Sequence, residues 1–264
     1  MKSSPIRQGA DFLSYLGEVV MLLGHGVRRL IGVNRLPPVM QRVLSLQFKF
    51  TALDAIPFTL ILALAAALMV VVQLELLDLF KTEIPGKLVV AVLVRELGPL
   101  LAALVVLARS GTAIVTELAG MRASGEIDAL RLRGIDPYDY LVIPRQGGVS
   151  LALVCLGQLF VVVALMGVFL FSSWVAASPP TWGVLLGQLG AEMSLADLVV
   201  VLLKTLVPGH LIAVIACREG IACSARQTEI PRAVTRAIVR ALVAVVLWNV
   251  LVSFAAYHLL QVRG

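Results

Sequence analysis

The sequence predicts an all-α integral membrane protein. An N-terminal amphipathic helix is followed by five transmembrane helices, and a short cytoplasmic helix lies between the second and third spans. Hydrophobic residues make up 59% of the chain and charged residues only 14%, whereas soluble proteins carry about 25% charged residues. Five apolar stretches each reach the roughly 20 residues that a helix needs to cross a bilayer. A soluble enzyme, a secreted disulfide scaffold and a disordered chain are therefore excluded.

The first expected element is an amphipathic helix at about residues 8–32 that lies in the membrane interface. Its apolar residues recur at close to helical period, whereas Asp11, Glu18 and Arg28 fall on other faces. The apolar positions are Phe12, Leu16, Val19, Leu23, Val27 and Leu30. Charges inside this stretch and the lack of a small-residue cleavage site argue against a cleavable signal. A soluble helix that packs on a partner protein stays the alternative.

Five spans follow, separated by four loops. The spans are expected at about 55–73, 88–108, 148–172, 197–216 and 239–260. The loops are expected near 74–87, 109–147, 173–196 and 217–238. Trp174 and Trp182 lie in the third loop, where interfacial aromatic residues are favoured. Because Pro179 and Pro180 break that loop, residues 182–193 are expected to form a short helix on the outer surface.

The distribution of basic residues predicts the orientation. Of the 22 Lys and Arg residues, 17 lie before the first span, in the 109–147 loop, or between the fourth span and the start of the fifth. Three lie on the other side, and two lie inside spans. Since basic residues concentrate on the cytoplasmic side, we expect a cytoplasmic N-terminus and a C-terminus outside. This placement accounts for the net charge of +6 without a nucleic-acid partner.

No combination of residues predicts catalysis or metal binding. The three Cys and three His residues are scattered along the chain. The chain has no P-loop lysine motif, no nucleophile elbow and no His-Glu-x-x-His motif. We therefore expect no enzyme activity and no cofactor in this chain, so that any chemistry is supplied by a partner.

Polar residues inside two spans are the first candidate site. The second span contains Arg95 and Glu96, followed by Pro99, and the fourth contains Lys204. Pro99 frees a backbone carbonyl one turn back, near Arg95, and this carbonyl must be accommodated locally. Arg95 and Lys204 both lie about 7 residues from the outer end of their span, or roughly 10 Å deep at 1.5 Å per residue. Charges in hydrocarbon are costly unless they face protein or water. They could form the wall of a cavity for a charged or amphipathic substrate, or an ion pair of Glu96 with either cation that holds the helices together.

The 109–147 loop is the second candidate site. Leu118, Met121, Ile127 and Leu130 form a rough apolar stripe among charged residues. Such an amphipathic helix fits a partner surface, although a solvated loop helix is the alternative.

These residues together carry a family resemblance. The motifs, in order, are Arg95-Glu96-Leu97-Gly98-Pro99, Ala108-Arg109-Ser110-Gly111-Thr112-Ala113, Glu117-Leu118, Met121-Arg122, Ile127-Asp128-Ala129-Leu130, Gly134-Ile135-Asp136-Pro137 and Pro144-Arg145. Weaker agreement includes Asp197, Lys204-Thr205 and Thr235-Arg236. The chain strongly resembles the MlaE/YrbE permeases, the membrane subunits of ABC lipid transporters that work with MCE-domain proteins.

The resemblance implies a single MlaE-type permease domain over residues 1–264 that forms a homodimer in the inner membrane. The loop helix, at about 117–130, would dock on a cytoplasmic ABC ATPase dimer, which binds ATP and Mg. The implied coupling residues are Glu117, Met121, Arg122, Glu126, Asp128 and Leu130. A periplasmic MCE-domain protein and a small STAS-type regulatory subunit are further partners that the resemblance suggests.

The implied activity is movement of phospholipid, or a similar lipid, between the inner membrane and the periplasmic side, in support of outer-membrane lipid asymmetry. The implied cavity residues are Arg95, Glu96, Pro99, Lys204 and Asn249. Arg95 and Lys204 could attract the lipid phosphate, while Glu96 moderates their charge.

Three positions depart from the family pattern. Gly125-Glu126 stands where Glu-Gln is common, residues 224–231 replace a glycine-rich run, and Asn249 stands where many members have Asp. A stand-alone secondary transporter or channel that uses the charges as an ion relay is the alternative function, although five spans give no even internal repeat. A non-transporting membrane scaffold is a third interpretation.

Overall fold

A computed structural model describes residues 17–26, 28, 37–79, 85–175 and 182–261. Within these ranges the chain consists of helices and turns, with no β-strand. Five helical segments are long and apolar enough to cross a membrane: Pro38–Leu76, Gly86–Ala123, Tyr138–Val175, Leu195–Ile221 and Gln227–His258. The predicted class, an all-α membrane protein with five spans, is confirmed.

Three of the five spanning segments change helix type along their length. The first is the α-helix α2 (Pro38–Leu76), and the second joins α3 (Pro85–Val89), π-helix η3 (Val90–Leu97), α4 (Gly98–Val106), π-helix η4 (Leu107–Gly111) and α5 (Thr112–Ala123). The short helix α6 (Glu126–Leu132) follows, and the third segment joins π-helix η5 (Tyr138–Val142) and α7 (Ile143–Val175). The remaining elements are α8 (Trp182–Glu192), α9 (Leu195–Ile221), the 3-10 turn η6 (Gln227–Glu229) and α10 (Ile230–Gln261).

The helices extend well beyond the apolar stretches from which the spans were predicted. The prediction of a loop at 109–147 is wrong for most of its length, because α5 continues the second span to Ala123 and the third span begins at Tyr138. The expected 217–238 loop is also shorter, since α9 ends at Ile221. Hydropathy locates only the apolar part of a helix, whereas Arg, Glu and Lys continue a helix readily. The helix expected at residues 182–193 is confirmed as α8.

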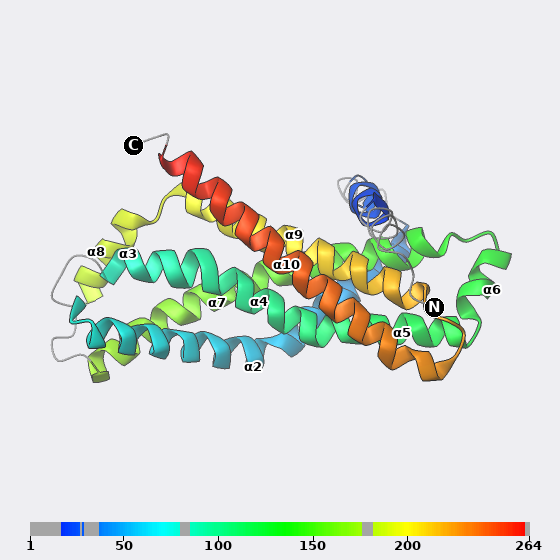
Figure 1. Cartoon of the computed structure of the whole chain (residues 1–264), viewed down its shortest axis with the longest axis horizontal. Helices are drawn as coiled ribbons and strands as arrows, with labels where there is room; N and C mark the ends of the chain where they lie inside the picture. The colour runs from blue at the N-terminus through cyan, green and yellow to red at the C-terminus, as the bar shows by residue number, and fades with distance from the viewer. Residues whose placement is uncertain (1–16, 27, 29–36, 80–84, 176–181, 262–264) are drawn as a thin grey trace, which may run out of the picture.

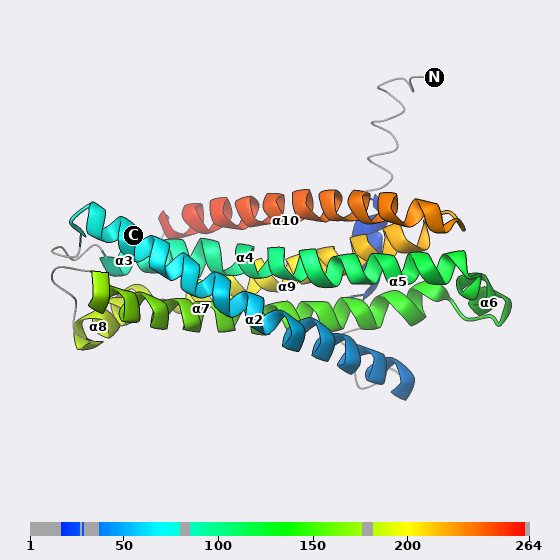
Figure 2. The same cartoon turned by 90° about the horizontal axis from the view of Figure 1, so that it is seen from below.

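The long helices lie side by side in one bundle, with α8 at one end and α6 at the other (Figures 1 and 2). We call these the α8 end and the α6 end. α2 packs mainly on α7, and α9 packs between α7 and α10. Small residues make these contacts close: a Cβ on Gly167 of α7 would lie 2.8 Å from Cβ of Ala67 in α2. Such small-residue contacts are how helices approach each other in membranes.

The described part of the expected interfacial helix, residues 17–26, is helical and lies near the α6 end. Val19 is buried. Oε2 of Glu18 lies 2.6 Å from Nη2 of Arg218, and Nε2 of His25 lies 3.0 Å from Oδ1 of Asp139. These residues therefore pack on the ends of α9 and η5. The rest of the expected 8–32 helix, apart from residue 28, lies outside the described residues.

Candidate functional site

The first candidate site begins at a proline in the second span. Pro99 has no backbone N–H, so the carbonyl of Arg95, four residues earlier, cannot receive the usual α-helical hydrogen bond. The helix adopts π geometry over Val90–Leu97, immediately before Gly98 and Pro99. Nζ of Lys204 in α9 donates to the carbonyl oxygen of Arg95 at 2.8 Å. The expectation that this carbonyl needs a local partner is confirmed.

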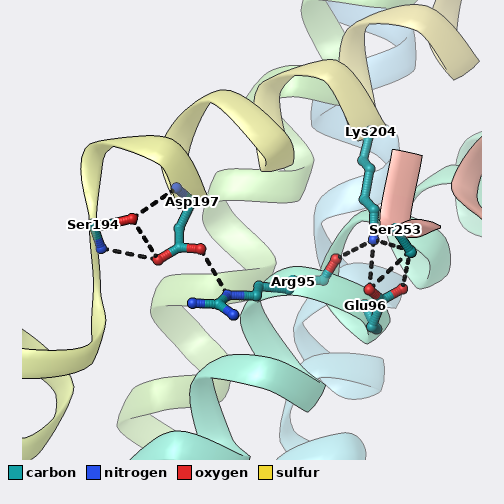
Figure 3. Close-up of polar contacts among 6 residues, drawn as sticks. All are labelled: Arg95, Glu96, Ser194, Asp197, Lys204 and Ser253. Atoms are coloured by element: carbon teal, nitrogen blue, oxygen red, sulfur yellow. Dashed lines mark hydrogen bonds and ion pairs between the residues drawn. The ribbon is translucent and has the colours of Figure 1, made fainter. Parts of the chain in front are cut away.

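The ammonium group of Lys204 is enclosed and fully hydrogen-bonded (Figure 3). Besides the carbonyl of Arg95, it donates to Oε1 of Glu96 at 2.7 Å and to Oγ of Ser253 at 2.6 Å. An ammonium has three N–H donors, and all three are used. The side chain is 0% exposed. Of the two cations considered as partners of Glu96, Lys204 is the one that pairs with it, and Lys204 has no donor left for a substrate in this conformation.

Arg95 turns away from this pair toward the start of α9 (Figure 3). Its Nε lies 2.7 Å from Oδ1 of Asp197, whose side chain is only 2% exposed. The other carboxylate oxygen of Asp197 accepts from the backbone N–H of Ser194 at 2.9 Å, within a capping box that begins α9. Two ion pairs therefore form, Lys204–Glu96 and Arg95–Asp197. The expected group of two cations and one carboxylate gains a second carboxylate and carries no net charge.

A groove of about 480 Å³ opens beside Glu96, between the second span and α10. Its lining is apolar apart from a few polar groups: Glu96, Leu100, Val246, Asn249, Val250, Ser253, Phe254 and Tyr257. The side chain of Glu96 is 47% exposed. Asn249 is 5% exposed, and its Nδ2 has no hydrogen-bond partner among the described residues. The groove thus combines apolar and polar surface, as a binding site for an amphipathic ligand does.

The five expected cavity residues are therefore only partly brought together. Glu96 and Asn249 line the groove, whereas Lys204 and Pro99 are buried behind it and Arg95 faces Asp197. Their role in binding a substrate stays a prediction. Sequence reasoning missed Ser253, which bridges Lys204 and Glu96, and gave no role to Asp197. The Ser194-x-x-Asp197 spacing of a capping box was the available signal for Asp197.

The second candidate site lies at the α6 end, and here the expected single helix over 117–130 is wrong. The helix is interrupted between α5 and α6, where Gly125 adopts a φ of 80°. Glycine takes this left-handed conformation without the steric cost that a Cβ brings. Arg122 and Asp128 form an ion pair across the break. Ser124 Oγ donates to Oε1 of Glu126 at 2.8 Å.

The remaining residues expected at this site divide into two places. Met121, Glu126 and Leu130 line a pocket of about 280 Å³ together with Ala129, Arg133 and Tyr140. Glu117 instead lies 2.7 Å from Nη2 of the buried Arg145 and so ties α5 to α7. Contact of these residues with a partner stays a prediction.

A second charged cluster, which sequence reasoning missed, joins α9 to α10 near the α6 end. The carboxylate of Glu219 is almost fully buried and forms ion pairs with Arg218, Arg236 and Arg240. Arg236 and Arg240 are one helical turn apart on α10, so that one carboxylate of α9 holds two successive turns of α10. Its position fixes the packing of these two helices at the end opposite to the groove.

Comparisons with known proteins agree with this architecture. A family model described as Permease MlaE matches residues 44–255. A probable ABC transporter permease of Synechocystis is 34% identical over 166 residues, which cover 63% of this chain and 62% of that protein. A probable ABC transporter permease of Rickettsia typhi is 32% identical over 165 residues, 62% of this chain and 63% of that protein.

A plant protein is also similar. The chloroplastic protein TRIGALACTOSYLDIACYLGLYCEROL 1 of Arabidopsis thaliana is 30% identical over 159 residues, 60% of this chain and 45% of that protein. This chain thus spans a little under two thirds of the length of the two bacterial relatives, at 62% and 63%.

Proposed function

Because the chain belongs to the MlaE permease family, we propose that it is the membrane subunit of an ABC transporter that moves phospholipid, or a similar lipid, between the inner membrane and the periplasmic side. A separate ATPase dimer hydrolyses ATP with Mg and drives the movement. Two relatives are named as probable ABC transporter permeases, and the plant relative bears the name of a glycolipid. The stand-alone secondary transporter is disfavoured, because both intramembrane cations are already paired.

The groove beside Glu96 is the observation that carries this proposal. Leu100, Val246, Val250 and Phe254 supply apolar walls, and polar groups meet at Glu96, Asn249 and Ser253. A lipid has apolar tails and a polar head and needs both kinds of surface. A ligand site that is mostly apolar with a few placed polar groups fits this requirement.

The same proposal assigns the other surfaces. Large exposed apolar side chains such as Val243, Leu247 and Leu251 follow α10 along the face beside the groove, which supports a homodimer in which a second copy closes the groove into a cavity. The ATPase docks at the α6 end, and the basic residues at that end support its cytoplasmic location. An MCE-domain protein covers the α8 end, and a small STAS-type subunit regulates the ATPase.

Reconstitution tests the function. The permease and its ATPase are placed in liposomes, and transfer of a fluorescent phospholipid is followed with and without ATP. Val250→Trp fills the groove and should reduce ATP-dependent transfer at least about tenfold, with the complex assembled. Val162→Trp is the matched control, because Val162 is similarly exposed on α7, at 55% against 60% for Val250, but lines neither the groove nor the proposed dimer face on α10. Equal transfer by the two variants, or no transfer by the native complex, would contradict the proposal.

A further inference from the structure

The groove presents a negative charge to its ligand, although the polar cluster behind it is neutral overall. Among the described side chains that line it, only Glu96 carries a charge at neutral pH. The ammonium of Lys204 is enclosed, and the guanidinium of Arg95 is held against Asp197. The expectation that two cations would face a lipid phosphate therefore does not match the geometry of this conformation.

Glu96 keeps acceptor capacity for a ligand. A carboxylate has about four lone-pair sites. Lys204 donates to Oε1, and Oγ of Ser253 lies 2.9 Å from Oε1 and 3.0 Å from Oε2, with the carbonyl of Asn249 at 2.9 Å as a third acceptor for its single hydroxyl proton. With the side chain 47% exposed, at least one site on Glu96 remains open to the groove.

Asn249 offers a donor deeper in the same groove. Its amide is almost fully buried, yet its Nδ2 has no partner among the described residues. Nδ2 is itself enclosed in this conformation, and a buried N–H without an acceptor is unfavourable, so rotation of the amide toward the groove, where a ligand oxygen can accept, would satisfy it. Asn249 precedes Ser253 by four residues on α10, and thus lies roughly 6 Å farther from the α8 end. Val246 continues the groove in the same direction with an apolar surface.

We infer that this groove selects phospholipids whose headgroup carries a primary ammonium, of the phosphoethanolamine type. The ammonium donates to Glu96 near the α8 end, Nδ2 of Asn249 donates to a phosphate or ester oxygen one turn deeper, and the tails follow the apolar wall beyond Val246. Charge-assisted hydrogen bonds are about twice as strong as neutral ones. A choline head has the positive charge but no N–H, and a phosphoglycerol head places net negative charge beside Glu96. This inference rests on the proposed function and names the substrate class of the same site.

Lipid competition tests the selection. The purified permease–ATPase complex is equilibrated with an equimolar mixture of phosphatidylethanolamine, phosphatidylcholine and phosphatidylglycerol with identical acyl chains, and bound lipids are counted by native mass spectrometry. We expect phosphatidylethanolamine to exceed phosphatidylglycerol by about tenfold, with phosphatidylcholine between them. Glu96→Gln should lower this ratio to about twofold or less.

Two further variants separate selection from general binding. Glu192→Gln removes a carboxylate that pairs with Lys87 at 3.6 Å at the α8 end, outside the groove lining, and should leave the ratio unchanged. Asn249→Ala should weaken the binding of all three lipids to a similar extent, since each has phosphate and ester oxygens.

The outcomes are distinguishable. Equal or greater retention of phosphatidylglycerol by the native complex overturns the inference. The inference is also overturned if Glu96→Gln leaves the ratio of phosphatidylethanolamine to phosphatidylglycerol unchanged, which is the result expected if a second copy of the chain fills the groove. Because the native ratio is itself decisive, poor assembly of the Glu96→Gln variant does not remove the test. A complex that binds and moves no phospholipid of any headgroup contradicts the proposed function instead.

Discussion

Lys204→Met removes the ammonium group at the centre of the polar cluster while keeping most of the side-chain volume. The native group is 0% exposed and has three acceptors, the carbonyl of Arg95, the carboxylate of Glu96 and the hydroxyl of Ser253. Removing one partner of a buried ion pair costs about 3–5 kcal/mol. Because Glu96 is 47% exposed, water recovers part of this loss, and we expect a decrease in the free energy of unfolding of about 2–3 kcal/mol.

A double-mutant cycle measures the same interaction independently. Glu96→Gln leaves Lys204 as an enclosed charge without its carboxylate, so this variant should lose about 3 kcal/mol or more. The double variant has no charge at either position and should be more stable than the sum of the single losses predicts, with a coupling free energy of about 1–2 kcal/mol. Reversible unfolding in mixed micelles, followed by circular dichroism, provides the free energies.

Lys87→Met is the control for loss of an ammonium group. Lys87 lies 3.6 Å from Glu192 and its side chain is 66% exposed, so the change should cost less than about 1 kcal/mol. If Lys204→Met unfolds at the same denaturant concentration as Lys87→Met, the ammonium of Lys204 does not stabilise the cluster and the argument fails.

Two glycines give further predictions. Gly125→Ala places a Cβ on a residue with a φ of 80° and should lower the free energy of unfolding by about 1–2 kcal/mol. In the reconstituted complex this variant should reduce ATP-dependent lipid transfer while lipid binding stays native. Native transfer would argue against a coupling role for the α5–α6 break. Gly209→Ala places a Cβ 2.5 Å from Cα of Ser150, so α7 and α9 must move apart. This should lower the free energy of unfolding by about 1–3 kcal/mol. Gly120→Ala, where the added Cβ meets nothing within 4 Å in this chain, is the control for the unfolding measurements, and equal stability of Gly209→Ala and Gly120→Ala would contradict the close packing.

The sequence predicted those features that depend on one stretch of chain at a time. The five spans follow from apolar length, and the need for a partner at the carbonyl of Arg95 follows from Pro99 alone. The helix ends were predicted poorly, because the charged residues of α5 continue the helix after the apolar stretch has ended. Gly125 was noted as a departure from the family pattern, but such a departure does not reveal a left-handed φ.

Pairing between helices was harder to predict, because it depends on how each helix is rotated about its axis. The similar depth of Arg95 and Lys204 indicated a polar cluster with Glu96, but either cation could have been the partner of this carboxylate. Arg95 is adjacent to Glu96 in sequence, yet it contacts Asp197 near the start of α9. Ser253 gave no signal, because a serine in an apolar helix commonly bonds to its own backbone. It does so here, to the carbonyl of Asn249 at 2.9 Å, and also contacts the two charged groups.

The Lys204 cluster links three spans at one point, and this has a consequence for any change in the width of the groove. Lys204 belongs to α9, Glu96 to the second span and Ser253 to α10. The second span is held to α9 by two ion pairs and by a hydrogen bond to a backbone carbonyl. At this level α10 is held by the hydroxyl of Ser253, which contacts Lys204 and Glu96, and by Nε1 of Trp248, which donates to the carbonyl of Leu203 at 3.0 Å. Hydrogen bonds contribute about 1 kcal/mol between neutral groups and about 1.5–3 kcal/mol to charged groups, whereas breaking a buried ion pair costs about 3–5 kcal/mol. Separation of the second span from α9 breaks two ion pairs, so separation of α10 at this level costs less. The groove therefore widens most readily by movement of α10, with Glu96 and Lys204 kept together as its fixed wall.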